Sequence, residues 1–365
     1  MRETATEGIR TFTLRRTFGE ERFISLPRAE GDSAEVLFER AVSFLEESEA
    51  SLVSVEGYGI PGDSSENIRT LKSALGGEGF PITWITPTPG ELSLGGLQAW
   101  AVSGARVEPI RMDGQVVGSW FEDDRARYLR LGGIISESTE QARDGQARRV
   151  FRALEKGLEA AGMSFADVVR TWFFIKEIDD WYAAFNRTRD EFFAESEIHV
   201  RLIPASTGVG CVDPSGPSLV GGLLAVRPKD SRVSSRSVPS PLQGSPLEYG
   251  SSFSRAMEVN ASDHRRLLIS GTASISGDGR TVSPDDTEGQ IAKTWEVVES
   301  ILSSRGMGWR DVSRGIAYFK QPSDSILFER FLETRGISFP TVFHHADICR
   351  RDLLFELEAD AIQES

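Results

Sequence analysis

Two stretches of this chain repeat one pattern and decide its fold: EKGLEAAGMSFADVVRTWFFIKEIDDW at residues 155–181 and VESILSSRGMGWRDVSRGIAYFKQPSDS at residues 298–325. Each begins within an amphipathic helix that ends at a glycine, Gly162 in the first and Gly306 in the second. Each continues through a β-rich run into the start of a second helix. A repeat of this length indicates tandem copies of one structural unit.

Further segments extend the repeat in both directions. The strand-like runs YLRLGGIIS (128–136) and LLISGTASI (267–275) precede the two stretches, and second helices follow at 182–196 and 326–336. Each copy closes with a Pro-containing strand, a turn and another strand. These closing segments lie at 82–102, at 201–211 with 218–226, and at 340–361.

A third and weaker copy lies at the N-terminus. It has a helix over 34–50, a strand over 51–59 and a helix over 66–77. The sequence therefore predicts an α+β fold of three tandem βαβαβ units, of which the first is degenerate. A sheet with helices on one face needs a cover for its other face, and three units around a pseudo-threefold axis provide it.

The predicted domain boundaries follow from these copies. They give a first unit at 1–114, a second at 115–235 and a third at 236–365. The segment 226–250 is rich in Pro, Ser and Gly, which predicts an extended linker.

The composition restricts the partners. The 365 residues carry a formal net charge of −14, and no basic run with interleaved aromatics is present, so nucleic acid is an unexpected partner. The absence of a long apolar run or signal peptide predicts no membrane association and a cytoplasmic chain. Two cysteines, Cys211 and Cys349, are too few for a disulfide framework.

The final stretch, FHHADICRRDLLFELEADA (343–361), combines a thiol and a carboxylate seven residues apart, Cys349 and Glu356. In a strand, Glu356 shares one face with Glu358 while Leu353, Phe355 and Leu357 share the other. On this pattern alone Glu356 could belong to a solvent face and Cys349 could be a small buried hydrophobe. The two arginines after Cys349 predict a thiol pKa that is lowered by nearby positive charge.

Several motifs carry a family resemblance. The order of ISG strand, glycine-terminated helix, DVVR, FN-x-x-R helix and Pro strand resembles the RidA (YjgF) imine-deaminase superfamily. Within it, EYGSSFSRA (248–256), ISGTASI (269–275), RLIPASTGVG (201–210) and HADICRRDLLFELE (345–358) resemble the chorismatases. This resemblance implies cleavage of the enolpyruvyl ether of chorismate to pyruvate and 3-hydroxybenzoate, with 4-hydroxybenzoate as a further product.

The resemblance also implies roles for the residues of the last stretch. Glu356 matches the catalytic acid that protonates the enolpyruvyl methylene carbon. Cys349 matches the cysteine of members that aromatise the ring, where it acts as a proton donor or transient nucleophile.

Substrate-binding residues follow from the same motifs. Arginines suit the two carboxylates of chorismate because guanidinium binds carboxylate bidentately; Arg201, Arg255 and Arg350 or Arg351 are the candidates, although surface arginines are common. Tyr249, Ser251, Ser252 and Phe253 are expected to line the site, or else to form a plain turn. Gly271 and Ala273 are expected at its floor, with a strand bulge as the alternative.

The remaining expectations concern metals, cofactors and rival functions. His344 and His345 point to opposite faces of a strand, so neither a metal nor an organic cofactor is expected. Two alternatives stay open: a chorismate hydrolase that stops at a dihydroxycyclohexadiene carboxylate, and a RidA-type enamine or imine deaminase. This chain lacks the arginine that a RidA-type deaminase uses just after the proline of the closing segment, which speaks against the deaminase. A non-catalytic carboxylate-binding protein is the third possibility, and a monomer with one site, in the third unit, is expected.

Overall fold

The structure is a computed structural model and describes residues 2–6, 8–29, 31–46, 50–60, 64–76, 79–86, 94–136, 138, 142–198, 202–211 and 216–364. Its strands form three six-stranded mixed sheets with one shared strand order. The first sheet runs β1 (Arg2–Thr6), β2 (Ile9–Arg16), β3 (Gly19–Pro27), β6 (Gly96–Ser103), β4 (Ser51–Tyr58), β5 (Ile82–Ile85). The second, in the same direction, runs β7 (Glu108–Met112), β8 (Gln115–Glu122), β9 (Ala126–Ile135), β12 (Leu219–Pro228), β10 (Val168–Ile175), β11 (Ala205–Val209). The third runs β13 (Ser234–Val238), β14 (Ala256–Asn260), β15 (His264–Ala273), β18 (Phe355–Glu364), β16 (Val312–Phe319), β17 (Thr341–His345).

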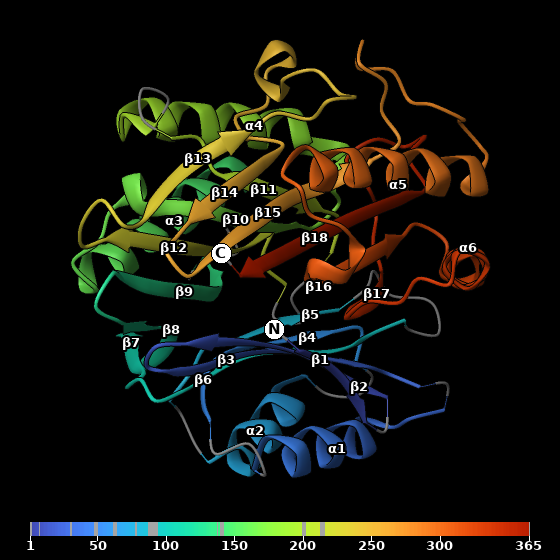
Figure 1. Cartoon of the computed structure of the whole chain (residues 1–365). Coiled ribbons are helices and arrows are strands. Elements are labelled where there is room, and N and C mark those ends of the chain that lie inside the picture. Colours follow the sequence, from blue (N-terminus) through green and yellow to red (C-terminus); the bar gives the residue numbers. More distant parts are fainter. Residues whose placement is uncertain are drawn as a thin grey trace.

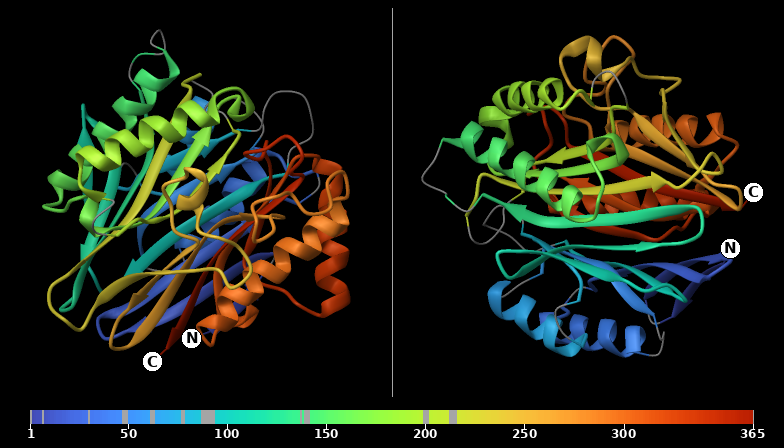
Figure 2. Two further views of the ribbon diagram at one scale, coloured as in Figure 1. Left: turned by 90° about the horizontal axis from the view of Figure 1, so that it is seen from above. Right: turned by 90° about the vertical axis from the view of Figure 1, so that its left-hand side faces the viewer.

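Two long helices accompany each sheet and lie on the outside of the molecule, while the three sheets face one another (Figures 1 and 2). They are α1 (Ala34–Glu46) and α2 (Ser64–Ala74), α3 (Arg143–Ala160) and α4 (Ile178–Glu195), and α5 (Thr287–Ser304) and α6 (Ser325–Arg335). Short 3₁₀ turns lie at Phe165–Asp167, Pro246–Tyr249, Trp309–Asp311 and Pro322–Asp324. The predicted α+β fold of three related units is confirmed by this architecture.

Apolar periodicity explains how the helices attach to the sheets. In α3, Ala147, Val150, Phe151, Leu154 and Leu158 are buried, which is the i, i+3, i+4, i+7 spacing of one helix face. The predicted stops are also confirmed, because Gly162 and Gly306 follow α3 and α5 with left-handed φ values of 66° and 67°.

A hydrophobic core lies where the three sheets meet. It contains Tyr58 and Trp100 from the first sheet, Trp172 from the second, and Leu268 and Tyr318 from the third. The inner faces of all three sheets are therefore buried against one another, as a pseudo-threefold arrangement requires.

The predicted linker is only partly correct. Within 226–250, residues Ser234–Val238 form β13, which pairs antiparallel with β14 as the edge of the third sheet. Val233 is buried just before this strand and Val238 is buried at its end. The backbone pairing with β14 thus orders the segment despite its Pro and Ser content. The hairpins β1–β2, β7–β8 and β13–β14 lie at corresponding edges of the three sheets and were not foreseen as strands.

The second and third sheets each begin shortly before the predicted unit boundaries, which follow residues 114 and 235. Strand β7 already belongs to the second sheet and β13 to the third. None of the helices in the described part of the chain is long and apolar enough to cross a membrane.

Candidate active site between the second and third sheets

A cavity of about 220 Å³ lies at the boundary between the second and third sheets. Helix α4 and strand β11 provide one wall, and β15, β18 and the loops before β14 and β18 provide the other. Its lining comprises Tyr182, Ala183, Asn186, Arg189, Ser206, Gly208, Ser251, Phe253, Arg255, Gly271, Ala273, Ile275, Cys349, Arg350 and Glu356. The cavity therefore unites seven of the ten predicted site residues, and the second unit closes it.

Glu356 projects into this cavity from β18 and is only 4 % exposed. The solvent-face alternative is therefore wrong for this carboxylate. Burial and the neighbouring charge of Glu358 raise the pKa of Glu356 to about 8, against the opposing effect of Arg170 and Arg255. The Glu356 carboxyl group is consequently protonated at neutral pH and can serve as a proton donor.

Glu358 lies two residues further along the same face and has the opposite protonation state. It is fully buried, and it accepts hydrogen bonds from Trp172 Nε1 at 3.0 Å and Arg314 Nη1 at 2.7 Å. Burial opposes its ionisation, but Arg314 and Arg170 outweigh that effect and lower the pKa of Glu358 to about 2. Two carboxyl groups whose environments separate their pKa values in this way are typical of acid–base sites.

Cys349 lines the same cavity but differs from the prediction in its acidity. Burial and the Glu356 carboxyl raise the pKa of the Cys349 thiol to about 12, although Arg350 and Arg255 act in the other direction. The expected lowering of this pKa is wrong because removal of the sulfur from water outweighs the nearby cations. Arg350 Nη1 is bonded to the Gly279 carbonyl at 2.7 Å, and the side chain of Arg351 is 79 % exposed.

Two of the candidate arginines have known positions at the cavity. Arg255 lines it from the loop before β14 and donates through Nε to the Gly244 carbonyl at 3.1 Å. Its guanidinium lies 5.6 Å from the centroid of the Phe253 ring. Arg350 also lines the cavity, whereas Arg351 does not; Arg201 lies outside the described residues.

The predicted residues between 249 and 253 do not all line the cavity. Ser251 and Phe253 line the cavity. Ser252 is buried but does not line it; its hydroxyl donates to Asp190 Oδ1 of α4 at 2.5 Å. Tyr249 ends a 3₁₀ turn, and its side chain lies outside what the structure describes.

The floor of the cavity is a strand irregularity. The pairing of β15 with β18 shifts register between Ile269 and Thr272, and this shift contains Gly271. A methyl group at Gly271 would collide with Oε1 of Glu356, so the absence of a side chain makes room for the carboxyl group. Gly271 therefore lies in a strand bulge and also allows the close approach of Glu356, so the two interpretations of this residue apply together.

No single residue of α4 or β11 was predicted to line the site, although the motif RLIPASTGVG (201–210) includes β11. Arg189 is 2 % exposed, donates through Nη2 to Asn186 Oδ1 at 2.9 Å, and lies 5.9 Å from the Phe253 ring centroid. Arg189 is therefore a buried cation that the second unit contributes to the cavity, in addition to Arg255 of the third unit. The FN-x-x-R pattern of α4 was visible in the sequence, but nothing in the pattern shows that this face of the helix contacts the third sheet.

A second cleft occupies the symmetry-related place between the third and first sheets. It has a volume of about 830 Å³, and its lining includes Arg10, Ile326, Glu329 and Leu332. The strand register places Arg10 where the third sheet has Arg255. At the position of Glu356, however, the first sheet has Gly96 and the second has Val220. Among these three equivalent positions, only that of the third sheet bears an acid.

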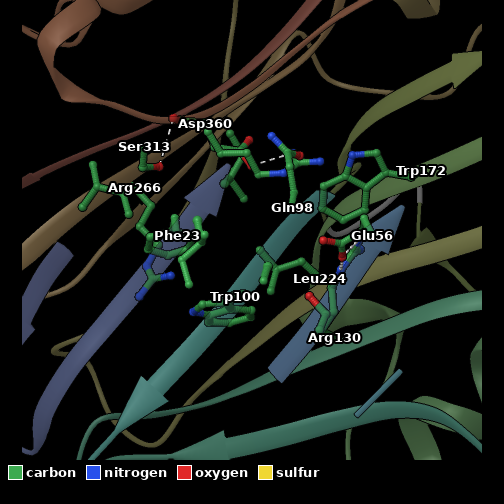
Figure 3. A pocket seen from close by; sticks show the side chains of 16 residues that line it. Phe23, Glu56, Gln98, Trp100, Arg130, Trp172, Leu224, Arg266, Ser313 and Asp360 are labelled. Carbon is green, nitrogen blue, oxygen red and sulfur yellow. Dashed lines mark hydrogen bonds and ion pairs between the residues drawn. The ribbon is translucent and has the colours of Figure 1, made fainter. Parts of the chain in front are cut away.

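A third cavity lies on the pseudo-threefold axis, and Glu356 is not among its lining residues. Figure 3 shows the side chains that line it. It has a volume of about 50 Å³ and is lined from all three sheets, with Glu56 and Arg130 paired at 3.0 Å on one side. Arg314 pairs with Asp360 within the lining, and Arg266 pairs with Glu21 outside it. The walls are largely apolar. The described residues contain no group of three His, Cys, Asp or Glu side chains that could hold a metal ion.

Comparisons with known proteins give one family-model match and several similar solved structures. A family model described as Endoribonuclease L-PSP matches residues 133–213. The crystal structure of a chorismatase matches over 99 % of both chains, with a TM-score of 0.64 and 18 % sequence identity. The E. coli YjgF gene product is 17 % identical, covers 35 % of this chain and 98 % of its own, and has a TM-score of 0.28. Rv2704 from Mycobacterium tuberculosis, of the YjgF/YER057c/UK114 family, has the same coverages and TM-score at 25 % identity.

The likenesses define the fold in two steps. The first is the class: an α+β molecule of three six-stranded sheets, of which the second includes the region that the Endoribonuclease L-PSP model matches. The second is the whole-chain arrangement, a tripartite pseudo-trimer whose fold is shared from end to end with the solved chorismatase structure. A search of curated protein sequences finds no match.

Proposed function

We propose that this protein is a chorismatase that converts chorismate to pyruvate and 3-hydroxybenzoate at the cavity between the second and third sheets. The observation that carries the proposal is Glu356: a buried carboxyl group, protonated at neutral pH, that projects into a cavity with buried arginines on two walls. Chorismate has an enol ether that needs a proton and two carboxylates that need cations. The whole-chain likeness to a solved chorismatase supports the same choice of substrate.

Binding would use the cations of both walls. Arg255 of the third unit and Arg189 of the second would each hold one carboxylate, and Arg350 would contribute at the mouth. Phe253 lies beside both Arg189 and Arg255, which gives the substrate ring an apolar wall between the two charges.

Glu356 would begin the reaction by donating its proton to the methylene carbon of the enolpyruvyl group. The oxocarbenium centre that results weakens the ether bond to ring C3. In the proposed aromatising route, the neighbouring ring hydroxyl displaces the ether oxygen and returns its proton to the Glu356 carboxylate, forming an arene oxide as pyruvate leaves. The arene oxide opens with loss of a ring proton to give 3-hydroxybenzoate. The atoms balance without added water, whereas the competing diol product requires one water.

Cys349 would act in the second half of this sequence. Because the pKa of its thiol is raised to about 12, it is a neutral group at physiological pH. We therefore assign it the role of a proton donor to the opening arene oxide rather than that of a thiolate nucleophile.

The experiment that tests the function is incubation of the purified protein with chorismate. Pyruvate release is coupled to lactate dehydrogenase, and the ring products are separated by chromatography. Pyruvate with 3-hydroxybenzoate is the expected result. Pyruvate with a non-aromatic diol would refute the aromatising step, and no pyruvate would refute the chorismatase assignment. We also propose that the protein is a monomer, because three sheets within one chain already cover one another. We propose a cytoplasmic location as a separate point.

A further inference from the structure

Three acidic side chains stand on one face of β18: Glu356, Glu358 and Asp360. Glu356 lines the candidate active site, and Asp360 lines the axial cavity that Figure 3 shows. Glu358 lies between them, is 0 % exposed and lines neither cavity. The proposed chemistry gives the buried Glu358 carboxylate nothing to react with, so its place beside Glu356 needs another explanation.

The partners of Glu358 come largely from the second unit. Strand β10 contributes Trp172 Nε1 at 3.0 Å and Arg170 Nη2 at 3.2 Å, and the Thr207 hydroxyl of β11 donates a further hydrogen bond. Strand β16 of the third unit adds Arg314 Nη1 at 2.7 Å and the Tyr318 hydroxyl at 3.3 Å. A carboxylate with this many donors stays ionised and is held in one orientation.

The same network reaches the floor of the active site. Thr207 Oγ1 accepts hydrogen bonds from Arg170 Nη2 at 2.8 Å and from the Gly271 backbone N–H at 3.0 Å. Gly271 lies against the Glu356 carboxyl group. Glu358 is thus connected to Glu356 in two ways, as its neighbour on the strand face and through Thr207 and Gly271.

We propose that Glu358 is a positioning residue: it is a fixed negative charge, set by the second unit, that keeps Glu356 in its proton-donating form. This inference rests on the proposed function of Glu356 as a general acid. Its physical basis is the repulsion between like charges in a buried setting, which makes ionisation of the second carboxyl group costly.

Other charged and titratable groups also face the pair, and they set the signs of the test. The groups around Glu356 are Glu358, Arg170, Arg255, Cys349, Arg350 and Cys211. Those around Glu358 are Arg170, Arg314, Asp360, Tyr318 and Tyr58. Loss of a nearby negative charge must lower the titration midpoint of Glu356, and loss of a nearby positive charge must raise it.

The test measures that midpoint directly. The full chain is labelled with ¹³C at glutamate carboxyl carbons, and the Glu356 resonance is assigned by its absence in Glu356→Gln. Glu358→Gln is expected to lower the midpoint by about one pH unit or more. Arg170→Gln is expected to raise it. Glu56→Gln, which removes a different buried and arginine-paired carboxylate, serves as the matched control and is expected to leave it unchanged.

The two variants are expected to shift the Glu356 midpoint in opposite directions. Structural damage alone would shift the midpoint of both variants in the same direction. A Glu358→Gln midpoint within about 0.3 pH unit of the unmodified protein would overturn the inference. If that variant does not fold, an Arg170→Gln midpoint that falls or stays unchanged would overturn it equally. Glu358→Asp keeps the charge and is expected to keep the raised midpoint. Because the titration needs no turnover, a protein inactive on chorismate with the expected shifts would refute the function and leave the charge coupling intact.

Discussion

Glu356 and Glu358 differ by two positions on one strand face, and their surroundings give them opposite protonation states. Glu358 has five donors around it, whereas Glu356 faces a cavity whose lining combines apolar side chains and the Cys349 thiol with arginines. Chemical identity alone therefore does not define the acid at this site. The environment of each carboxyl group does.

Replacement of Glu356 by Gln is expected to reduce kcat/KM for chorismate by about 10²- to 10⁴-fold, because an amide keeps the shape but cannot supply the proton. Coupled pyruvate release measures the effect. Glu329→Gln, in the related cleft between the third and first sheets, is the control and is expected to leave turnover unchanged. Undiminished turnover in Glu356→Gln would contradict the mechanism.

The pH dependence of kcat/KM should show the state of this acid. The pKa of Glu356 is raised to about 8, and only the protonated form can donate. Activity is therefore expected to be sustained below that value and to fall tenfold per pH unit above it. A decline centred near the ordinary glutamic acid value of about 4.3 would show that the pKa of the catalytic acid is not raised.

Replacement of Cys349 by Ala should change the product rather than the rate of pyruvate release. Proton donation by the thiol is placed after ether cleavage, so its loss diverts the ring towards the diol. Chromatography of the ring products measures the ratio. Cys211→Ala removes a thiol that lies outside the cavity lining and is the matched control. An unchanged product ratio in Cys349→Ala would remove the cysteine from the mechanism.

At the scale of elements, the irregular pairing of β15 with β18 makes the site possible. The shift between Ile269 and Thr272 brings the backbone of Gly271 against Glu356, where a regular ladder would place a side chain. The motif ISGTASI indicated an unusual strand, but the partner of that irregularity lies about 85 residues away in the chain. Pairing register, and not local pattern, decides such a contact.

Gly271→Ala is expected to lower kcat/KM by about 10²-fold with little change in Tm, because the new methyl group displaces the flexible end of Glu356 rather than the backbone. Chorismate kinetics and thermal unfolding measure the two effects. Gly308→Ala is the control, since nothing lies within 4 Å of a methyl group there and its φ is −144°. A large loss of Tm in Gly271→Ala would show that this glycine serves the fold and not the carboxyl group.

At the scale of the whole molecule, equivalent positions of the three sheets have acquired different residues that pair with one another. Glu21, Tyr128 and Arg266 occupy the same register position on β3, β9 and β15. Glu21 accepts a hydrogen bond from Arg266 Nη2 at 2.6 Å and also pairs with Arg16, which bonds the Tyr128 hydroxyl at 3.2 Å. A symmetric trimer would place three identical residues there, so this layer distinguishes the units and specifies their order.

Glu21→Gln is expected to destabilise the fold by about 3–5 kcal/mol, because it leaves buried guanidinium groups without their counter-charge. Urea unfolding measures the change. Burial opposes ionisation of Glu21, but Arg266 and Arg16 outweigh it and lower its pKa to about 2. The stabilisation is therefore present above the unfolded-state pKa of about 4.3 and is lost as pH falls towards 2. The exposed pair of Arg148 and Glu195 is the control, and Glu195→Gln should change stability little.

The sequence by itself determined the repeat, the helices with their terminal glycines, and the shared face of Glu356 and Glu358. These features depend on residues close together in the chain, through periodicity and capping. Only the tertiary structure decided that the second unit closes the cavity, that Arg189 joins it while Arg351 stays outside, and that burial raises rather than lowers the pKa of Cys349. Those outcomes depend on which faces meet across more than 100 residues of chain and on how far each group is removed from water, and a local pattern contains neither quantity.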